Sequence, residues 1–120
     1  MPGPMPTIYK ICGASEWDEA VRAGVYRGSP IDLRDGYIHF STAEQVAETT
    51  AKHFAGQDDL LLIAVDTAAL GPELKWESAR GGALFPHLYC TLPVIAVLWA
   101  KPLPLDRAGR HALPCLAHGP

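Results

Sequence analysis

Apolar residues recur along the chain with the spacing of short strands and helices. Alternation over residues 8–12 predicts a strand that ends at Gly13. A helix is predicted over residues 15–23, because Ser15 suits an N-cap and the apolar residues after it share one helical face. Gly24 suits the C-terminal end of that helix, since glycine readily adopts the left-handed conformation found there. A strand followed directly by a helix is therefore expected in this part of the chain.

Turn-forming residues dominate the next stretch, residues 25–36, which is rich in glycine, proline, serine and aspartate. This density of turn residues predicts an extended loop rather than a helix or strand. A second strand is predicted over residues 37–41. Thr42 and Gln45 then form a capping box for a helix that stops before Gly56. The second strand should therefore run straight into the second helix.

The strongest strand signal covers residues 59–66, which are apolar on both faces and so predict a central strand. Further strands are predicted over residues 74–78, 84–89 and 94–99, and Pro86 should interrupt the middle one of these three. Many strands with only two main helices predict an α+β fold.

The size and composition of the chain indicate a single globular domain. The chain has 120 residues, of which 48% are hydrophobic and 19% are charged. This length supports one core but is too short for two ordinary domains. We expect one domain over residues 7–104, a loose leader over residues 1–6, and a tail over residues 105–120 that is partly ordered at most.

Charge and hydropathy narrow the classes of partner. The net charge of −3 and the isoelectric point near 5.9 leave no broad basic surface, which disfavours nucleic acid as a partner. The longest apolar run, residues 60–65, is far shorter than the roughly 20 residues that cross a bilayer. The amino-terminal residues also lack the basic-then-apolar pattern of a signal peptide. We therefore expect a cytoplasmic protein with no membrane partner, and the sequence leaves its oligomeric state open.

Two short segments each present an imidazole and, two residues later, a hydroxyl. These pairs are His39 with Ser41 and His87 with Tyr89. Because side chains alternate along a strand, the members of each pair share one face. If the two strands are neighbours, the four polar groups converge and suit ligand binding or acid–base chemistry. A single histidine of this kind is more often a hydrogen-bonded structural residue, but two such segments make a shared site an equal alternative.

Glu77 and Arg80 flank a glycine turn, where an acid, a guanidinium and free backbone N–H groups could meet an anionic or ribose-bearing ligand. A surface ion pair is the alternative interpretation of these two residues. The amino terminus of the helix after Thr42 is a further anion site, beside His39 and Ser41. These groups favour a cleft that binds a nucleotide-like or phosphorylated small molecule.

Our leading hypothesis gives each of these residues a role. His39 is the acid–base or ligand-orienting group, His87 and Tyr89 hold a ribose or base, and Arg80 meets phosphate. Whether the protein is an enzyme stays open, with transferase activity as one alternative. A second hypothesis is a noncatalytic binding module with structural histidines. A third is a metal site formed by His39, His87 and Glu77.

Residues 8–11, 35–42, 45, 76–77 and 85–89 together resemble the small bacterial family called domain of unknown function 952. This resemblance covers about residues 7–104. The family has no settled activity, so the resemblance implies a fold relationship and no particular reaction.

A remoter resemblance involves the order of elements from His39 onward. This order is similar to the C-terminal half of RNA 2′-phosphotransferases, which belong to the wider ADP-ribosyltransferase fold. That fold is a split pair of small antiparallel sheets that holds NAD or an ADP-ribosylated intermediate. The resemblance implies that His39 and Ser41 line the cleft, and that Lys10 stands near the first-strand position where the larger group usually has histidine or arginine. Glu77 is the stand-in for a transferase glutamate, and Tyr9, Lys10 and Thr42 join the expected ligand-binding residues. The cofactor stays open, with NAD or ADP-ribose as the candidates.

Overall fold

The computed structural model describes residues 7–116, apart from the side chain of Arg80. The described chain contains antiparallel sheets and three α-helices, which confirms the predicted α+β class. The predicted leader, residues 1–6, lies outside the described residues. Within the predicted tail, residues 105 and 111 form a bridge, and Leu116 packs against the core.

The larger sheet contains β1 (Thr7–Gly13), β4 (Leu60–Asp66) and β8 (Val97–Pro102) in the order β1-β4-β8. Both pairings are antiparallel, and β4 is the central strand, as its two apolar faces predict. Leu62 and Ile63 on β4 are fully buried on opposite faces of the sheet. This sheet therefore contributes to a core on each side.

The second sheet contains β3 (Ile38–His39), β6 (Leu84–Leu88) and β5 (Leu74–Ser78) in the order β3-β6-β5. Contrary to prediction, β6 continues through Pro86. The Pro86 carbonyl accepts a hydrogen bond from the Phe40 N–H at 3.0 Å, so the missing N–H of Pro86 faces that same edge. Because β3 ends at His39, the missing donor interrupts no ladder pairing.

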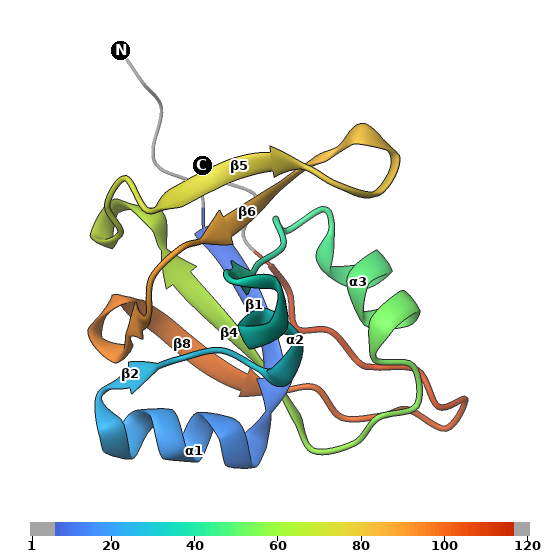
Figure 1. The fold of residues 1–120 in the computed structure, drawn as a ribbon. Coiled ribbons are helices and arrows are strands. Elements are labelled where there is room, and N and C mark those ends of the chain that lie inside the picture. The colour runs from blue at the N-terminus through green and yellow to red at the C-terminus, as the bar shows by residue number, and fades with distance from the viewer. Residues whose placement is uncertain (1–6, 117–120) are drawn as a thin grey trace.

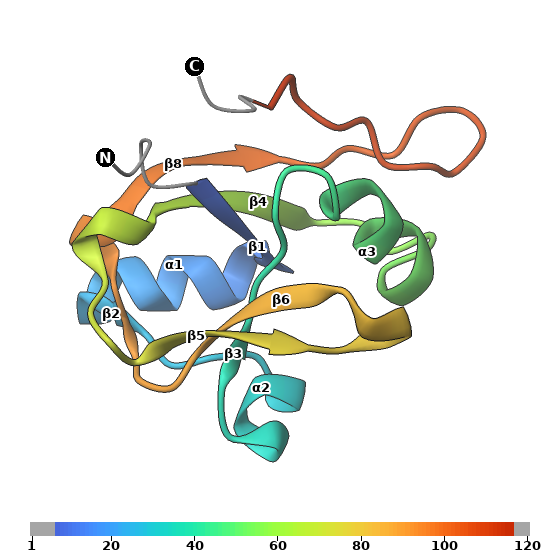
Figure 2. The same ribbon diagram turned by 90° about the horizontal axis from the view of Figure 1, so that it is seen from above.

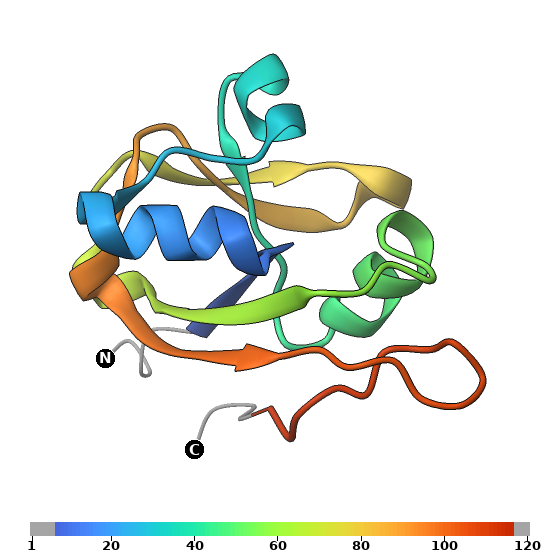
Figure 3. The ribbon, with the colours of Figure 1, turned by 90° about the horizontal axis from the view of Figure 1, so that it is seen from below.

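The two sheets form two layers, and the helices lie around the space between them (Figure 1). Figures 2 and 3 show α1 (Ala14–Ala23) at one end of this space and α3 (Val46–His53) at the other, whereas α2 (Pro30–Asp35) projects beyond β3. A small sheet of β2 (Val25–Tyr26) and β7 (Leu92–Pro93) lies next to α1. No helix in the described residues is both long and apolar enough to cross a membrane.

The helix α2 lies where a loop was predicted, so the prediction for residues 25–36 is wrong. Ser29 is its N-cap and Pro30 its first residue, the position that proline favours. Asp32 reaches back to accept the Ser29 N–H at 2.9 Å, as in a capping box. Gly36 ends the helix with φ of 89°, a conformation that other residues rarely adopt. A short helix of this kind is difficult to recognise in a sequence, because helix caps and turns use the same amino acids.

Other boundaries shift by a few residues. The first helix begins at Ala14 after Gly13, whose N–H donates to the Glu16 carboxylate at 2.9 Å. The strand predicted over residues 94–99 is instead a 3₁₀ turn, Val94–Ala96, followed by β8. Two more 3₁₀ turns cover Thr67–Ala69 and Arg80–Gly82.

Alternate residues of β1 enter two different core clusters. Ile8 and Cys12 pack with α1 and the second sheet, whereas Tyr9 and Ile11 pack with α3 and the carboxyl-terminal segment. Lys10 lies on the Ile8 face and is only 5% exposed. A buried lysine requires a partner of opposite charge, and β1 therefore needs an acid close to Lys10.

Candidate functional site

A pocket of about 450 Å³ lies between β1 of the first sheet and the β3–β6 edge of the second. Segments that are far apart in the sequence meet in its wall: β1, α2, α3, β6 and the residues around β3. Its polar side chains include those of Lys10, Asp35, His39, Ser41 and His87. Its aromatic side chains include those of Tyr37, Phe40, Phe54 and Phe85.

The two histidine-bearing segments are neighbours in this wall. His39 on β3 pairs directly with His87 on β6, and their ring centroids are 5.6 Å apart. Tyr37 contacts both imidazoles, stacking on His87 at 4.1 Å and lying against His39 at 4.6 Å. The structure therefore brings together two imidazoles that are 48 residues apart, with the Tyr37 ring in contact with both.

Both ring nitrogens of His39 face carboxylates. Nδ1 lies 2.6 Å from Asp32 Oδ1, and Nε2 lies 3.0 Å from Asp35 Oδ2. Both aspartates come from α2, the helix that the sequence did not predict. Because a carboxylate only accepts hydrogen bonds, Nδ1 donates to Asp32, and a doubly protonated ring would pair with Asp35 as well.

Asp32 joins three elements through one buried carboxylate. Its side chain is 1% exposed and also contacts Lys10 Nζ at 2.7 Å, the Ser29 N–H at 2.9 Å and the His39 N–H at 3.1 Å. Burial alone would raise the pKa of Asp32, but the hydrogen bond with His39 and the charge of Lys10 outweigh it and hold this pKa far below its usual value. Asp32 therefore holds α2, β1 and β3 together as an ionised group.

His87 has a different pattern of partners. Its Nδ1 lies 2.8 Å from Glu77 Oε1, and the Tyr89 hydroxyl donates to the same oxygen at 2.6 Å. The hydrogen bonds from Tyr89 and His87 lower the pKa of Glu77. The same bond to Glu77 raises the pKa of Tyr89 to about 12. Glu77 and Tyr89 therefore act on the pocket through His87, since neither is among the described residues that line it.

The hydroxyl residues lie on the α3 side. The chain crosses from the second sheet to β1 after His39, so Ser41 bridges to Tyr9 instead of continuing β3. Ser41 Oγ is 3.0 Å from Thr49 Oγ1 on α3, and both residues line the pocket. Thr42 is not among the described lining residues, and its N–H donates to Gln45 Oε1 at 3.0 Å. The predicted capping contact between Thr42 and Gln45 is present, although the α-helix itself begins at Val46.

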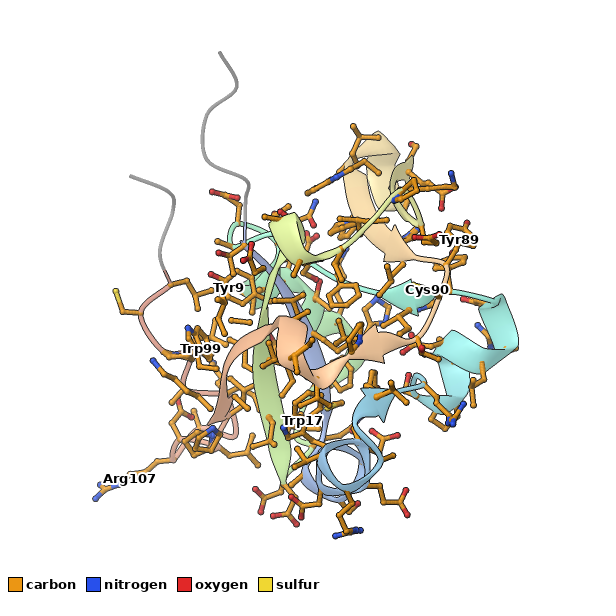
Figure 4. All side chains as sticks on the ribbon, turned by 90° about the vertical axis from the view of Figure 1, so that its left-hand side faces the viewer. Tyr9, Trp17, Tyr89, Cys90, Trp99 and Arg107 are labelled. Carbon is orange, nitrogen blue, oxygen red and sulfur yellow. The ribbon has the colours of Figure 1, made fainter. Side chains whose placement is uncertain are left out.

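Tyr9 and Lys10 both contribute to the pocket wall, with different roles. The Tyr9 ring is 2% exposed and packs against Trp99 with ring centroids 6.0 Å apart. Figure 4 shows Tyr9 near Trp99 and well separated from Tyr89. Lys10 forms the buried ion pair with Asp32. Both residues are therefore held firmly by the protein itself.

Two further predictions have simple outcomes. The backbone of Arg80 lies in the 3₁₀ turn after β5, and its side chain lies outside the described residues. Within residues 7–116, no group of three or more His, Cys, Asp or Glu side chains is arranged to hold a metal ion. The metal hypothesis for His39, His87 and Glu77 therefore gains no support from this geometry.

The backbone of β1 also faces the pocket. The N–H and C=O of Tyr9 both bond to Ser41 at 2.8 Å, on the edge away from β4. Since alternate residues of a strand direct these groups to the same edge, the N–H and C=O of Ile11 point the same way. Ile11 lines the pocket, and within the described chain no hydrogen bond reaches these two groups. The pocket therefore has an adjacent donor and acceptor on its wall.

The model of the family described as "Protein of unknown function (DUF952)" matches residues 11–100. The chain belongs to this family. A crystal structure of protein CC0527 from Caulobacter crescentus is 50% identical to the chain, with a TM-score of 0.85, and covers 88% of this chain and 93% of that one. The solution structure of CC0527 is 51% identical, with a TM-score of 0.78, and covers 87% of this chain and 90% of that one. No curated protein matches the chain.

The residues of this DUF952 site that sequence reasoning missed include Asp32, Asp35, Tyr37 and Thr49. Asp32 and Asp35 were missed because their segment was predicted as a loop, although Ser29-Pro30 followed by an acid three positions after the cap is a helix-start signal. Tyr37 could have been found by alternation, since it lies two residues before His39. Thr49 has no comparable signal.

Proposed function

We propose that the pocket binds a small molecule with a nucleoside-like ring, such as NAD or ADP-ribose. A volume near 450 Å³ falls within the range of small-molecule sites, which are mostly apolar with a few placed polar groups. The aromatic side chains of Tyr37, Phe40, Phe54 and Phe85 suit a planar ring. The family and the similar structures carry no activity to set against this proposal.

The open edge of β1 is the observation that carries the proposal. The N–H and C=O of Ile11 offer a donor beside an acceptor, which complements an amide or the edge of a nucleobase. A ligand that used both groups would satisfy a strand edge that is otherwise open within the described chain. Backbone recognition of this kind gives the ring a fixed orientation in front of His39 and His87.

Charge favours the nucleoside part of such a ligand inside the pocket rather than its phosphates. Lys10 is the cation in the pocket wall, but Asp32 already pairs with it, and His39 faces Asp32 and Asp35. A phosphate would therefore lie toward the rim of the pocket. The pocket residue Ala79 directly precedes the turn that contains Arg80, and Thr42 lies just before the start of α3. In this arrangement Ser41, Thr49 and His87 contact the sugar.

A relationship to ADP-ribosyltransferases belongs to the same proposal. Two small antiparallel sheets beside a pocket suit the split-sheet architecture of those enzymes, and transferase activity on the bound nucleotide would follow from it. We also propose a cytoplasmic location, since NAD and ADP-ribose are available there.

A noncatalytic binding module is the second candidate, and one observation favours it. Both nitrogens of His39 are occupied by carboxylates, and Asp32 is buried, so this histidine already has a structural role. Ligand binding would then proceed without proton transfer by His39. The two candidates share the pocket and differ only in whether the bound molecule reacts.

Thermal unfolding in the presence of NAD, ADP-ribose and AMP tests the proposal. A ligand at 100 times its dissociation constant stabilises the folded state by about 2.7 kcal/mol, which raises the unfolding temperature measurably. Ala79→Phe places a ring in the pocket and should abolish the shift. Ala83→Phe lies in the same hairpin turn but outside the described lining, and should keep it. Equal shifts in both variants, or none with any of the nucleotides in the wild type, would count against the proposal.

A further inference from the structure

The two histidines of the pocket differ in which ring nitrogen is available. His39 has neither, because Nδ1 faces Asp32 at 2.6 Å and Nε2 faces Asp35 at 3.0 Å. Nδ1 donates to Asp32, and the Asp35 carboxylate lies in front of Nε2, so an acid of the protein faces each nitrogen. The protein's own acids therefore hold His39 in place.

His87 keeps one nitrogen open. Its Nδ1 donates to Glu77 at 2.8 Å, which leaves the lone pair of the neutral ring on Nε2. No described group bonds to Nε2. His87 is 5% exposed and lines the pocket, so access to Nε2 would be from the pocket side.

The ring of His87 is held in that orientation from several sides. Tyr37 stacks on its face at 4.1 Å with an interplanar angle of 28°. Glu77 fixes Nδ1 from β5, and Tyr89 supports the same carboxylate oxygen. His39 faces it from β3, and Lys75 is its partner in register on β5. The charged and titratable groups around His87 therefore include Glu77, Lys75 and His39.

We propose that Nε2 of His87 is the proton acceptor of this pocket, that Glu77 is its positioning residue, and that His39 takes no part in proton exchange. The proton comes from a hydroxyl of the bound molecule: its O–H bond breaks, an N–H bond forms at Nε2, and the electron pair stays on oxygen. Glu77 compensates the charge that appears on the ring. Only the identity of the ligand rests on the proposed function. The different roles of His39 and His87 rest on contacts within the protein itself.

Diethyl pyrocarbonate tests this division without a ligand. A neutral imidazole nitrogen attacks one of its carbonyl carbons, an N–C bond forms, a C–O bond breaks, and ethanol and carbon dioxide are released. Peptide mass spectrometry should find His87 modified and His39 unmodified in the folded protein at neutral pH. Asp35→Ala uncovers Nε2 of His39 and should make that residue reactive as well. Modification of His39 in the wild type, or none at His87, would overturn the proposal.

Nitrogen-15 NMR of the imidazoles gives a second measurement that does not depend on reagent access. The wild type should show protons on both nitrogens of His39 and on Nδ1 alone in neutral His87. Glu77→Ala should let the Nε2–H form of His87 appear, whereas Glu77→Gln, whose amide oxygen still accepts, should keep the Nδ1–H form. An Nε2–H ring in the wild type contradicts the proposal. Protection of His87 from diethyl pyrocarbonate by ADP-ribose tests the ligand separately. If His87 reacts equally with and without ADP-ribose, ADP-ribose is not the ligand, and the different roles of the two histidines are unaffected.

Discussion

His39 and His87 are direct partners on β3 and β6, with ring centroids 5.6 Å apart, yet carboxylates face both ring nitrogens of His39 and only one ring nitrogen of His87. His39 is enclosed by two aspartates of α2, and His87 is held at one nitrogen by Glu77 of β5. One imidazole therefore belongs to the framework of the site, and the other presents a nitrogen to the pocket. Framework and pocket can be tested separately, because different side chains support them.

Asp32→Ala should destabilise the protein by about 3–5 kcal/mol, because it leaves the buried charge of Lys10 without its partner and removes the carboxylate that accepts from His39 Nδ1. Asp35→Ala is the matched control on the same helix. Its side chain is far more exposed than that of Asp32, so its loss should cost much less. Urea denaturation measures both values, and equal losses in the two variants would show that Asp32 does not hold the site together.

The pH dependence of stability should report the same carboxylate. The pKa of Asp32 is lower in the folded state than in the unfolded chain, so its contribution is complete above about pH 4 and declines as the pH falls further. The difference in unfolding free energy between the wild type and Asp32→Ala should therefore shrink from neutral pH toward about pH 2. Urea midpoints across that range measure it. A difference that grows as the pH falls would refute the assigned direction.

The hydroxyl of Tyr89 should ionise at a higher pH than that of an ordinary tyrosine. Its hydrogen bond to Glu77 raises its pKa to about 12, so its contribution to folding is present below about pH 10 and is lost as the pH rises through about 12. NMR of tyrosine labelled with carbon-13 at the phenol carbon follows this ionisation, and Tyr89→Phe assigns the signal. Glu77→Gln removes the negative acceptor and should lower the pKa of Tyr89. An unchanged value in that variant would mean that Glu77 is not the cause.

Leu62→Ala should cost about 2–5 kcal/mol, because Leu62 is fully buried on the central strand β4 and its removal leaves a cavity. Leu98→Ala, on the edge strand β8, is the control. Leu98 is 55% exposed, and its loss should stay within about 0.5 kcal/mol. Thermal or chemical denaturation distinguishes the two, and a similar cost at both positions would contradict the assignment of β4 as the core strand.

The sequence predicted the parts of this fold that have strong local signals. The apolar run at residues 60–65 identified the central strand because a strand covered on both faces needs apolar residues at every position. Gly24 marked the end of α1, where φ is 85°. By contrast, α2 was missed, since its six residues, which begin at Pro30 after the Ser29 cap, carry as many turn signals as helix signals.

The candidate site was predictable only in part. Alternation placed His39 and His87 on strand faces, but the pairing of β3 with β6 is a long-range contact that no local pattern encodes. The acids that give the two histidines different partners, Asp32 and Glu77, come from different elements. Hydrogen-bond partners depend on tertiary geometry, so the contrast between the two imidazoles could not be read from their own segments.

Proton–nitrogen correlation spectra of the backbone, recorded while ADP-ribose is added, test most directly whether the pocket is a binding site. Binding as proposed should shift the amide signal of Ile11 most strongly, together with those of Ser41 and His87, and Ala79→Phe should remove these shifts while Ala83→Phe retains them. Shifts confined to α1 and β2, on the other side of the molecule from α3, or no shifts with ADP-ribose or NAD at millimolar concentration, would contradict it.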